Sequence, residues 1–437
     1  MVYGVGDVWT GVLQRLKAAW RPLLAVNLVY AALGIVLLAP LPGIVTRLLV
    51  RLSGNTALAD QEIAWFLLTP FGIASLILVV AIIIAIAALA QASMMFIGVC
   101  PEGEPDLTRG ALLFSAAKAP SVLSFCVRLV ARVLLMTAPF LAVGGGAAWL
   151  LITDYDINYY LSVRPPSFWV AAVIISVLLA AMLVVVVRKV LGWSLALPLV
   201  LFSGVSPSRS FAESERRIRG NRRLVLWIVM TWALLALLLG ALGLFVVQQL
   251  GSWLTPRFHE DLTILVIVLG GIMALWALLN FLSTSISGAT FALAIVELTE
   301  RLGTRIDVAG DSLQTTGRRT RTWKITPARV ALLLIAGTLV SVAAGAWLVD
   351  SVPMRDDVII VAHRGAAGKA PENTLAAVRQ AIEDGTDWVE IDVQETADGE
   401  VVVIHDSDFM KLAGVDLKVR DGALQQLSLI HISEPTR

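Results

Sequence analysis

The sequence predicts two parts of different kinds: an α-helical polytopic membrane domain over residues 1–350, followed by the start of a parallel α/β domain. Apolar residues make up 57% of the 437 residues and charged residues only 15%. A typical soluble domain has about 45–50% and about 25%. Residues 351–426, in contrast, have the frequent charged residues of a soluble domain. We therefore expect a chain that crosses a lipid bilayer and then continues into water.

About seven apolar stretches are long enough for a transmembrane helix, which needs about 20 mostly apolar residues. They are roughly Leu23–Leu41, Phe71–Ile97, Leu129–Ile152, Phe168–Val187, Leu224–Val247, Leu262–Leu282 and Ala328–Val349. Two shorter apolar pieces have more than one interpretation. Leu191–Val205 contains Pro198 and fits a re-entrant segment or a core helix. Ile286–Glu297 either extends the sixth span or lies beside it.

The basic residues predict the orientation of these spans. Lys and Arg are densest in residues 188–223 and 301–329, and cytoplasmic loops carry such an excess. With these segments inside, the N-terminus is inside and the acidic 154–164 loop is outside. Seven spans then leave residue 350 outside. We expect a multi-pass protein of the cell (cytoplasmic) membrane with its C-terminal domain on the extracytoplasmic side.

The segment after Asp350 has the pattern of strands and one helix. Short β-branched runs are typical of buried strands, and a helical stripe that ends at Gly385 is typical of a capped helix. The expected elements are a strand at Val358–Ala362, a helix at Thr374–Asp384, a strand at Trp388–Gln394, a turn at Asp398-Gly399 and a strand at Val401–Ile404. This order indicates a parallel α/β sheet, of which a barrel is one form.

Four polar residues fall at the ends or on one face of these strands. His363 and His405 end the first and third strands, where barrel enzymes build their sites. Glu390 and Asp392 are two apart, so they share one face of the second strand. Buried carboxylates are costly unless they are paired or bind a cation. Oxygen ligands favour a divalent metal such as Mg²⁺ or Ca²⁺.

The run HRGAAGKAPENTLAAVRQAIEDGTDWVEIDVQETADGEVVVIHD resembles the opening of the glycerophosphodiester phosphodiesterase family, in its form with an N-terminal multi-span membrane domain. The HRG, PENT, E-x-D and HD elements occur in order and at the spacing of the family, over about 70 residues. The resemblance implies that residues 351–426 are the first part of a (β/α)8 TIM-barrel phosphodiesterase domain. It also implies hydrolysis of glycerophosphodiesters to glycerol 3-phosphate and an alcohol.

The resemblance implies a role for each matching residue. His363 and His405 match the general acid/base pair, Glu390 and Asp392 match two metal ligands, Arg364 matches the residue that contacts the substrate phosphate, and Glu372 matches a position near the site whose role stays open. Taken singly, Arg364 also fits a surface ion pair, and Glu372 fits a helix-start residue favoured by the helix dipole. Asp406 and Asp408 fit turn residues better than ligands.

The chain departs from the family at its C-terminal end. A barrel of eight strands takes about 250 residues, and the third carboxylate ligand of the family has no counterpart here. Residues 427–437 (LSLIHISEPTR) read like the translation of a sequencing adapter, so we expect an artefact there. We also expect the polypeptide as written to show no phosphodiesterase activity.

Other functions fit parts of the sequence. The membrane region could be the working part, as a scaffold or transporter with a non-catalytic barrel appendage. A related barrel could also cleave phosphoinositides or other phosphodiesters. The expected partners are a glycerophosphodiester and the lipid bilayer. A net charge of +1 gives no reason to expect nucleic acid. The alcohol moiety, the metal and the oligomeric state stay open.

Overall fold

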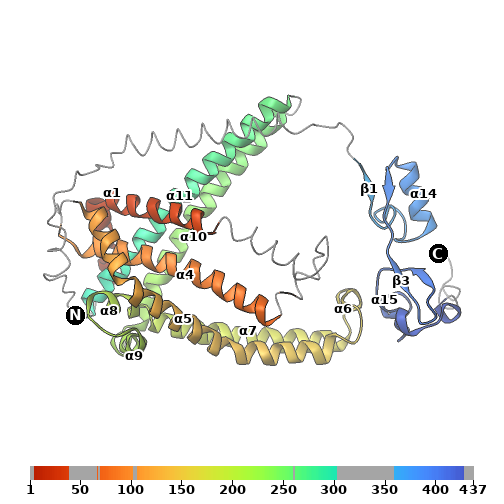
Figure 1. Cartoon of the computed structure of the whole chain (residues 1–437), viewed down its shortest axis with the longest axis horizontal. Coiled ribbons are helices and arrows are strands. Elements are labelled where there is room, and N and C mark those ends of the chain that lie inside the picture. Colours follow the sequence, from red (N-terminus) through yellow and green to blue (C-terminus); the bar gives the residue numbers. More distant parts are fainter. Residues whose placement is uncertain are drawn as a thin grey trace. The chain divides into compact units, whose positions relative to one another are not determined.

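The computed structural model of the chain describes residues 4–38, 66, 69–101, 106–258, 261–302 and 359–427. In the described ranges, the regular elements up to residue 302 are helices, and the strands lie in the C-terminal segment, drawn in blue in Figure 1. The chain forms two compact units. Unit 1 comprises Met1–Leu134 and Val186–Ser351, and unit 2 comprises Leu135–Val185 and Val352–Arg437. The two units are described separately below.

Six helices in the described part of the chain are long and apolar enough to cross a bilayer. They are α1 (Val5–Leu38), α4 (Pro70–Val99), α5 (Leu107–Ile152), α7 (Pro166–Gly192), α10 (Arg222–Leu254) and α11 (Leu262–Arg301). They correspond to six of the seven predicted spans, which confirms a mostly helical region with several long apolar helices. The predicted seventh span, Ala328–Val349, lies outside the described residues.

The two ambiguous apolar pieces have different outcomes. Leu191–Val205 contains a short helix, α8 (Ala196–Phe202), whose side chains are mostly buried, so this piece forms core rather than a full span. Ile286–Glu297 extends the sixth span, because α11 is one continuous helix of 40 residues. The amphipathic helix α9 (Pro207–Ile218), the short helix α6 (Ile157–Val163) and a single turn, η1 (Thr255–Arg257), complete the described helical elements up to residue 302.

Unit 1 is held by apolar packing with a few internal polar pairs. Helix α11 packs against α1, α4 and α10, and these contacts surround a large cluster of buried apolar side chains. The hydroxyl of Tyr30 lies 2.7 Å from that of Ser115. The carboxylate of Glu297 is 3.1 Å from Arg15 and 2.7 Å from Arg301. Its charge is therefore compensated where it is buried.

The C-terminal segment begins with a strand, helix, strand unit. Strand β1 (Val361–Ala362) pairs in parallel with β2 (Trp388–Val389). Between them lies α14 (Leu375–Glu383), which begins after Thr374 because the Thr374 hydroxyl accepts a hydrogen bond from the Ala377 N–H at 3.2 Å. The helix that the sequence predicts at Thr374–Asp384 is confirmed.

The predicted second strand, Trp388–Gln394, is wrong as one continuous element. The chain leaves β2 at Glu390 and forms a new strand, β3 (Val393–Glu395), which pairs antiparallel with β4 (Val401–Val403). Parallel strands need a crossover of a dozen or more residues, and the short turn at Asp398-Gly399 permits only an antiparallel hairpin. The parallel arrangement therefore holds only for β1 and β2 in the described residues.

The rest of the segment is built on a small apolar cluster. Helix α15 (Met410–Ala413) and the turn η2 (Val419–Asp421) follow β4. The buried side chains of this cluster are Ile404, Phe409, Val419 and Leu427. The cluster fixes the turn that directly follows β4, and this turn carries His405.

Candidate functional site

The turn after β1 is shaped by a glycine. Gly365 has φ +77, and a Cβ at this position would lie 2.5 Å from the Cβ of Ala377. Only glycine fits such close contact in this backbone conformation. The Gly365 N–H donates to the Glu390 carbonyl at 3.0 Å, and the Arg364 N–H donates to the Glu390 carboxylate at 2.8 Å. The turn therefore places Arg364 against the residues that follow β2.

Arg364 connects three carboxylates. Its Nε lies 3.2 Å from Asp392 Oδ2, and its Nη1 donates to Glu372 Oε2 at 2.9 Å. Its backbone N–H binds Glu390, as described above. Burial acts to lower the pKa of Arg364, but the neighbouring carboxylates outweigh this effect, and the pKa is raised. Arg364 is therefore a fixed positive charge at the meeting point of the HRG, PENT and E-x-D elements.

Asn373 fixes the position of Asp392. The Asn373 side chain donates to Asp392 Oδ2 at 2.9 Å and accepts from the Asp392 backbone N–H at 3.0 Å. Asn373 has φ +61, a conformation that asparagine adopts more readily than most residues. The two bonds orient this carboxylate toward Arg364.

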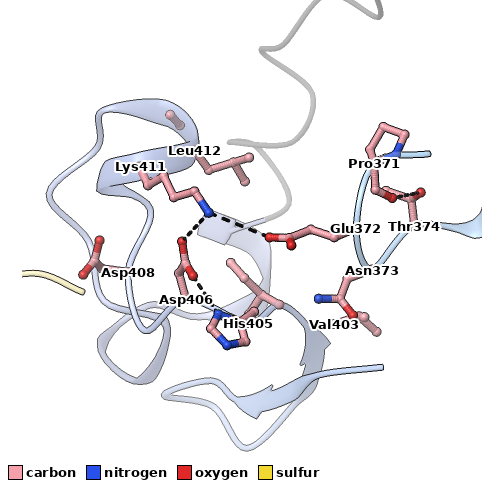
Figure 2. Close-up of a pocket in the computed structure, with 12 residues that line it drawn as sticks. Pro371, Glu372, Asn373, Thr374, Val403, His405, Asp406, Asp408, Lys411 and Leu412 are labelled. Carbon is pink, nitrogen blue, oxygen red and sulfur yellow. Dashed lines mark hydrogen bonds and ion pairs between the residues drawn. The ribbon is translucent and has the colours of Figure 1, made fainter. Parts of the chain in front are cut away.

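His405 is oriented by the carboxylate of the next residue. Its Nδ1 lies 2.8 Å from Asp406 Oδ1, and Lys411 Nζ lies 3.4 Å from Asp406 Oδ2 and 3.8 Å from Glu372 Oε1 (Figure 2). Burial acts to raise the pKa of Asp406, but hydrogen bonds from His405 and Asn158 and the charge of Lys411 lower it overall. The ionised Asp406 can only accept, so the Nδ1 of His405 carries the proton, and Nε2 is the atom that can take up another.

A cavity of about 490 Å³ lies beside His405. Its lining comes from the PENT stretch, the end of β4, the turn after it and α15 (Figure 2). The polar lining residues include Glu372, Asn373, His405, Asp406, Asp408 and Lys411. The volume is in the range of a small-molecule site. This cavity brings two of the sequence-predicted residues, Glu372 and His405, to one place.

The other predicted residues do not line this cavity. Arg364 contacts its lining through the ion pair with Glu372, and Asp392 does so through its hydrogen bonds with Asn373. His363 is exposed and does not line the cavity either. The two histidines that the sequence pairs are thus not gathered around the same cavity.

The metal expectation fits the described residues only in part. Glu390 and Asp392 supply oxygen donors, which suit a hard cation. Both are in contact with Arg364, and within the described ranges no group of three or more His, Cys, Asp or Glu side chains is gathered as a metal site. Two carboxylates are fewer than the six to eight oxygen ligands of Ca²⁺. We therefore derive no step through a metal.

The structure adds three residues that the sequence alone did not single out. Asn373, Asp406 and Lys411 each contact a sequence-predicted site residue. Asn373 lies within the PENT element, so its signal was present in the motif. Asp406 was interpreted as a turn residue. Lys411 belongs to no sequence motif, and the fold of α15 places it at the site.

Residues 363–436 match the Glycerophosphoryl diester phosphodiesterase family. A "Glycerophosphodiester phosphodiesterase" of Caldanaerobacter subterraneus is 42% identical over 69 residues, which cover 16% of this chain and 28% of that protein. "Glycerophosphodiester phosphodiesterase 1" of Bos taurus is 57% identical over 53 residues, or 12% and 16%. The human "Lysophospholipase D GDPD1" is 43% identical over 61 residues, or 14% and 19%.

These relatives match only the C-terminal segment of the chain. The chain spans 28% of the length of the Caldanaerobacter protein and less of the bovine and human proteins. No solved structure matches the chain. The family matched is the one that the HRG, PENT, E-x-D and HD elements resemble, so the recognition made from the sequence is confirmed. Residues 363–436 thus match a domain of the glycerophosphoryl diester phosphodiesterase family, and a helical region consistent with a membrane domain precedes them.

Proposed function

We propose that this protein is a membrane-anchored, metal-dependent phosphodiesterase that hydrolyses glycerophosphodiesters to glycerol 3-phosphate and an alcohol. The observation that carries the proposal is the joining of the four family elements: Arg364 contacts Glu372 and Asp392, and Glu372 lines the cavity that holds His405. This arrangement combines a fixed cation, an oriented imidazole and a cavity. Hydrolysis of a phosphodiester uses each of these features.

His405 supplies the proton transfer in this proposal. Its Nδ1 faces Asp406 at 2.8 Å, so its Nε2 takes or gives the proton at the reacting oxygen. We assign the complementary proton transfer to His363, which directly follows β1. Two imidazoles suit such an exchange near neutral pH.

Arg364 holds the substrate phosphate in this proposal. A guanidinium has five N–H donors in a fixed fork, and the described contacts of the Arg364 side chain with Glu372 and Asp392 involve Nη1 and Nε. The remaining donors would bind phosphate oxygens and offset the charge that develops on them. Glu372 then serves as the residue that orients Arg364 toward the cavity.

Glu390 and Asp392 would hold a divalent cation, Mg²⁺ or Ca²⁺, which supplies electrostatic stabilisation of the phosphate when bound. Further ligands would have to come from outside the described residues, because the described ones supply only this pair. We further propose that the C-terminal domain adopts a (β/α)8 barrel, which the parallel β1–β2 pair with its α14 crossover supports.

We place the protein in the cytoplasmic membrane, with the C-terminal domain on the extracytoplasmic side. Six long apolar helices support the membrane location. The distribution of Lys and Arg and the predicted seventh span support the sidedness. A reporter fused after residue 352 would test it, and a signal from the cytoplasmic side would contradict the assignment.

The test of the proposed activity is release of glycerol 3-phosphate by the purified protein, expressed from a genomic clone in detergent or vesicles. We expect release that stops with a chelator and returns with Mg²⁺ or Ca²⁺. The same assay on Glu390→Gln should show a loss of activity, because one proposed ligand then carries no charge. Release that is unaffected by chelator would contradict the metal dependence, and an absence of release would contradict the function.

A second function is a membrane scaffold or transporter with a non-catalytic domain. The polar pairs of the helical region favour the scaffold form of this alternative, because Glu297 connects α1 and α11 through its ion pairs with Arg15 and Arg301. Binding or movement of a ligand by a protein that shows no hydrolysis would favour this alternative.

A further inference from the structure

The connection between α5 and α7 contacts the turn that carries His405. Both segments belong to unit 2, although about 250 residues separate them. The Asp156 backbone N–H donates to Asp408 Oδ2 at 2.6 Å, and Asp156 Oδ2 accepts from the Ser407 backbone N–H at 3.2 Å. These two bonds run in opposite directions. Asp156 therefore holds the turn in a defined register.

Asn158 reaches the carboxylate that orients His405. Its Nδ2 donates to Asp406 Oδ1 at 2.9 Å, and the same oxygen lies 2.8 Å from His405 Nδ1. The other oxygen of Asp406 faces Lys411 at 3.4 Å. The side chain of Asp406 is therefore fixed from three directions, and one of the three is the connection between two membrane helices.

Aromatic packing stiffens this connection. Helix α6 (Ile157–Val163) begins after Asp156 and buries Tyr159 and Tyr160, whose rings lie 5.2 Å apart. The Tyr155 ring lies 5.3 Å from that of Tyr159. The pKa of Tyr155 is raised, first by burial and then by the charge of Asp416 in the C-terminal segment. α6 also packs against α15, so the connection is seated on the segment rather than projecting freely.

The burial of the acidic turn agrees with this docking. Asp406 is 8% exposed and Asp408 only 1%. Buried carboxylates are costly unless they accept hydrogen bonds. The Asp156 N–H and the Asn158 amide supply one such bond to Asp408 and one to Asp406. Without the connection, both carboxylates would lose a donor.

We propose that Asp156 and Asn158, at the start of this connection, are part of the active site, and that Asn158 is a positioning residue that acts on His405 through Asp406. The chemical role rests on the proposed function, whereas the docking does not. Docking also requires both segments to lie on one side of the membrane. Three described helices, α7, α10 and α11, lie between them in the chain, so a fourth crossing is needed. The span that the sequence predicts at Ala328–Val349, outside the described residues, would be that crossing.

Disulfide cross-linking tests the docking in the 437-residue chain in membrane vesicles. The background is Cys100→Ser with Cys126→Ala, and the test pair is Asp156→Cys with Ser407→Cys. The backbone bond from residue 156 to Asp408 is kept in this pair. We expect rapid intramolecular cross-linking under mild oxidation.

The matched control moves one cysteine to the opposite end of β4. It pairs Asp156→Cys with Glu400→Cys, which precedes β4, so the three residues of β4 alone place it about 10 Å from the turn at about 3.3 Å per residue. Equal yields for the two pairs, or no product from the test pair, would overturn the docking. This result does not depend on hydrolysis.

Enzyme kinetics test the positioning role of Asn158. They use the protein expressed from the genomic clone, whose release of glycerol 3-phosphate is measured. We expect Asn158→Ala to lower kcat by about 10-fold to 100-fold, with little change in KM, because a misplaced catalytic group costs about that much. Asn158→Gln keeps an amide donor and should recover part of the loss. Ser162→Ala is the control, since its described hydrogen bonds go only to carbonyls within α6.

The outcomes separate the two proposals. An unchanged kcat in Asn158→Ala, or a loss confined to KM, would overturn the positioning role while leaving the proposed function in place. A wild-type protein that releases no glycerol 3-phosphate would overturn the proposed function, and the cross-linking result would still decide the docking.

Discussion

The helical region of residues 4–302 and the C-terminal segment of residues 359–427 differ in what their charged side chains contact. In the helical region Glu297 is 7% exposed, and its carboxylate lies between two guanidinium groups, those of Arg15 and Arg301. In the C-terminal segment Glu372, His405 and their neighbours line an open cavity. Glu297 therefore connects α1 with α11, whereas His405 faces a cavity whose volume is in the range of a small-molecule site.

The largest effect expected from this contrast is the loss of hydrolysis in His405→Ala. General acid/base groups contribute about 10²-fold to 10⁴-fold, so glycerol 3-phosphate release by the protein from the genomic clone should fall by about that factor. Arg379→Ala, on an exposed position of α14, is the control and should keep its rate. If the rate of His405→Ala lies within about twofold of the wild-type rate, the loss of transition-state stabilisation is far below the roughly 1.4 kcal/mol of a tenfold effect. Such a result would remove His405 from the mechanism.

The next effect belongs to the helical region and concerns stability rather than activity. Glu297→Ala removes the buried carboxylate between Arg15 and Arg301 and leaves Arg15 paired with the more exposed Glu300. Removal of one partner of a buried pair costs about 3–5 kcal/mol. We expect a lower unfolding temperature in detergent, followed by tryptophan fluorescence, and an unchanged kcat for the molecules that remain folded.

Glu300 provides the control for Glu297. It also pairs with Arg15, but its side chain is 36% exposed against 9% for Glu297. Exposed ion pairs contribute about 0–1 kcal/mol. Glu300→Ala should therefore shift the unfolding temperature much less. Equal shifts for the two variants would contradict the distinction between a buried and an exposed ion pair.

The two regions also differ in how far the sequence predicts them. Length and apolar content predict six described helices, because a bilayer span depends on little else. They do not predict that Ile286–Glu297 continues α11. In the C-terminal segment the family motifs predict the candidate site residues better than the sequence pattern predicts the strands. The predicted strand breaks at Glu390 because local side-chain bonds replace strand pairing there, as in the bond from the Asp392 N–H to Asn373 at 3.0 Å.

The contacts of Asn158 mark the point where prediction from sequence stops. This residue lies in a short connection with no motif, 248 positions from Asp406. Its role depends on a fold that brings distant segments together. Lys411 is a similar case at shorter range, since its ion pair with Glu372 at 3.8 Å depends on the folding of α15.

A smaller effect is expected from Gly365→Ala. The residue has φ +77, and its added Cβ would lie 2.8 Å from the Ala377 carbonyl carbon. Residues held in such backbone regions cost about 1–3 kcal/mol each. We expect faster limited proteolysis of the C-terminal segment. Gly368→Ala meets no atom within 4 Å and is the control. Equal protection of both variants would contradict the steric account of the turn.

The smallest effect concerns an exposed ion pair between the loop after β1 and the C-terminal end of α14. Lys369 Nζ lies 2.7 Å from Asp384 Oδ1 and, with Gln380, lowers the pKa of Asp384. A lowered folded-state pKa stabilises the fold above the unfolded pKa, and this stabilisation is lost as pH falls through the folded value. Lys369→Ala should therefore differ slightly from wild type in protease protection at neutral pH and not at the acid end. Solvent and salt screen such pairs, so the difference should also vanish in high salt. A difference that persists there would mean that Lys369 contributes by packing rather than by charge.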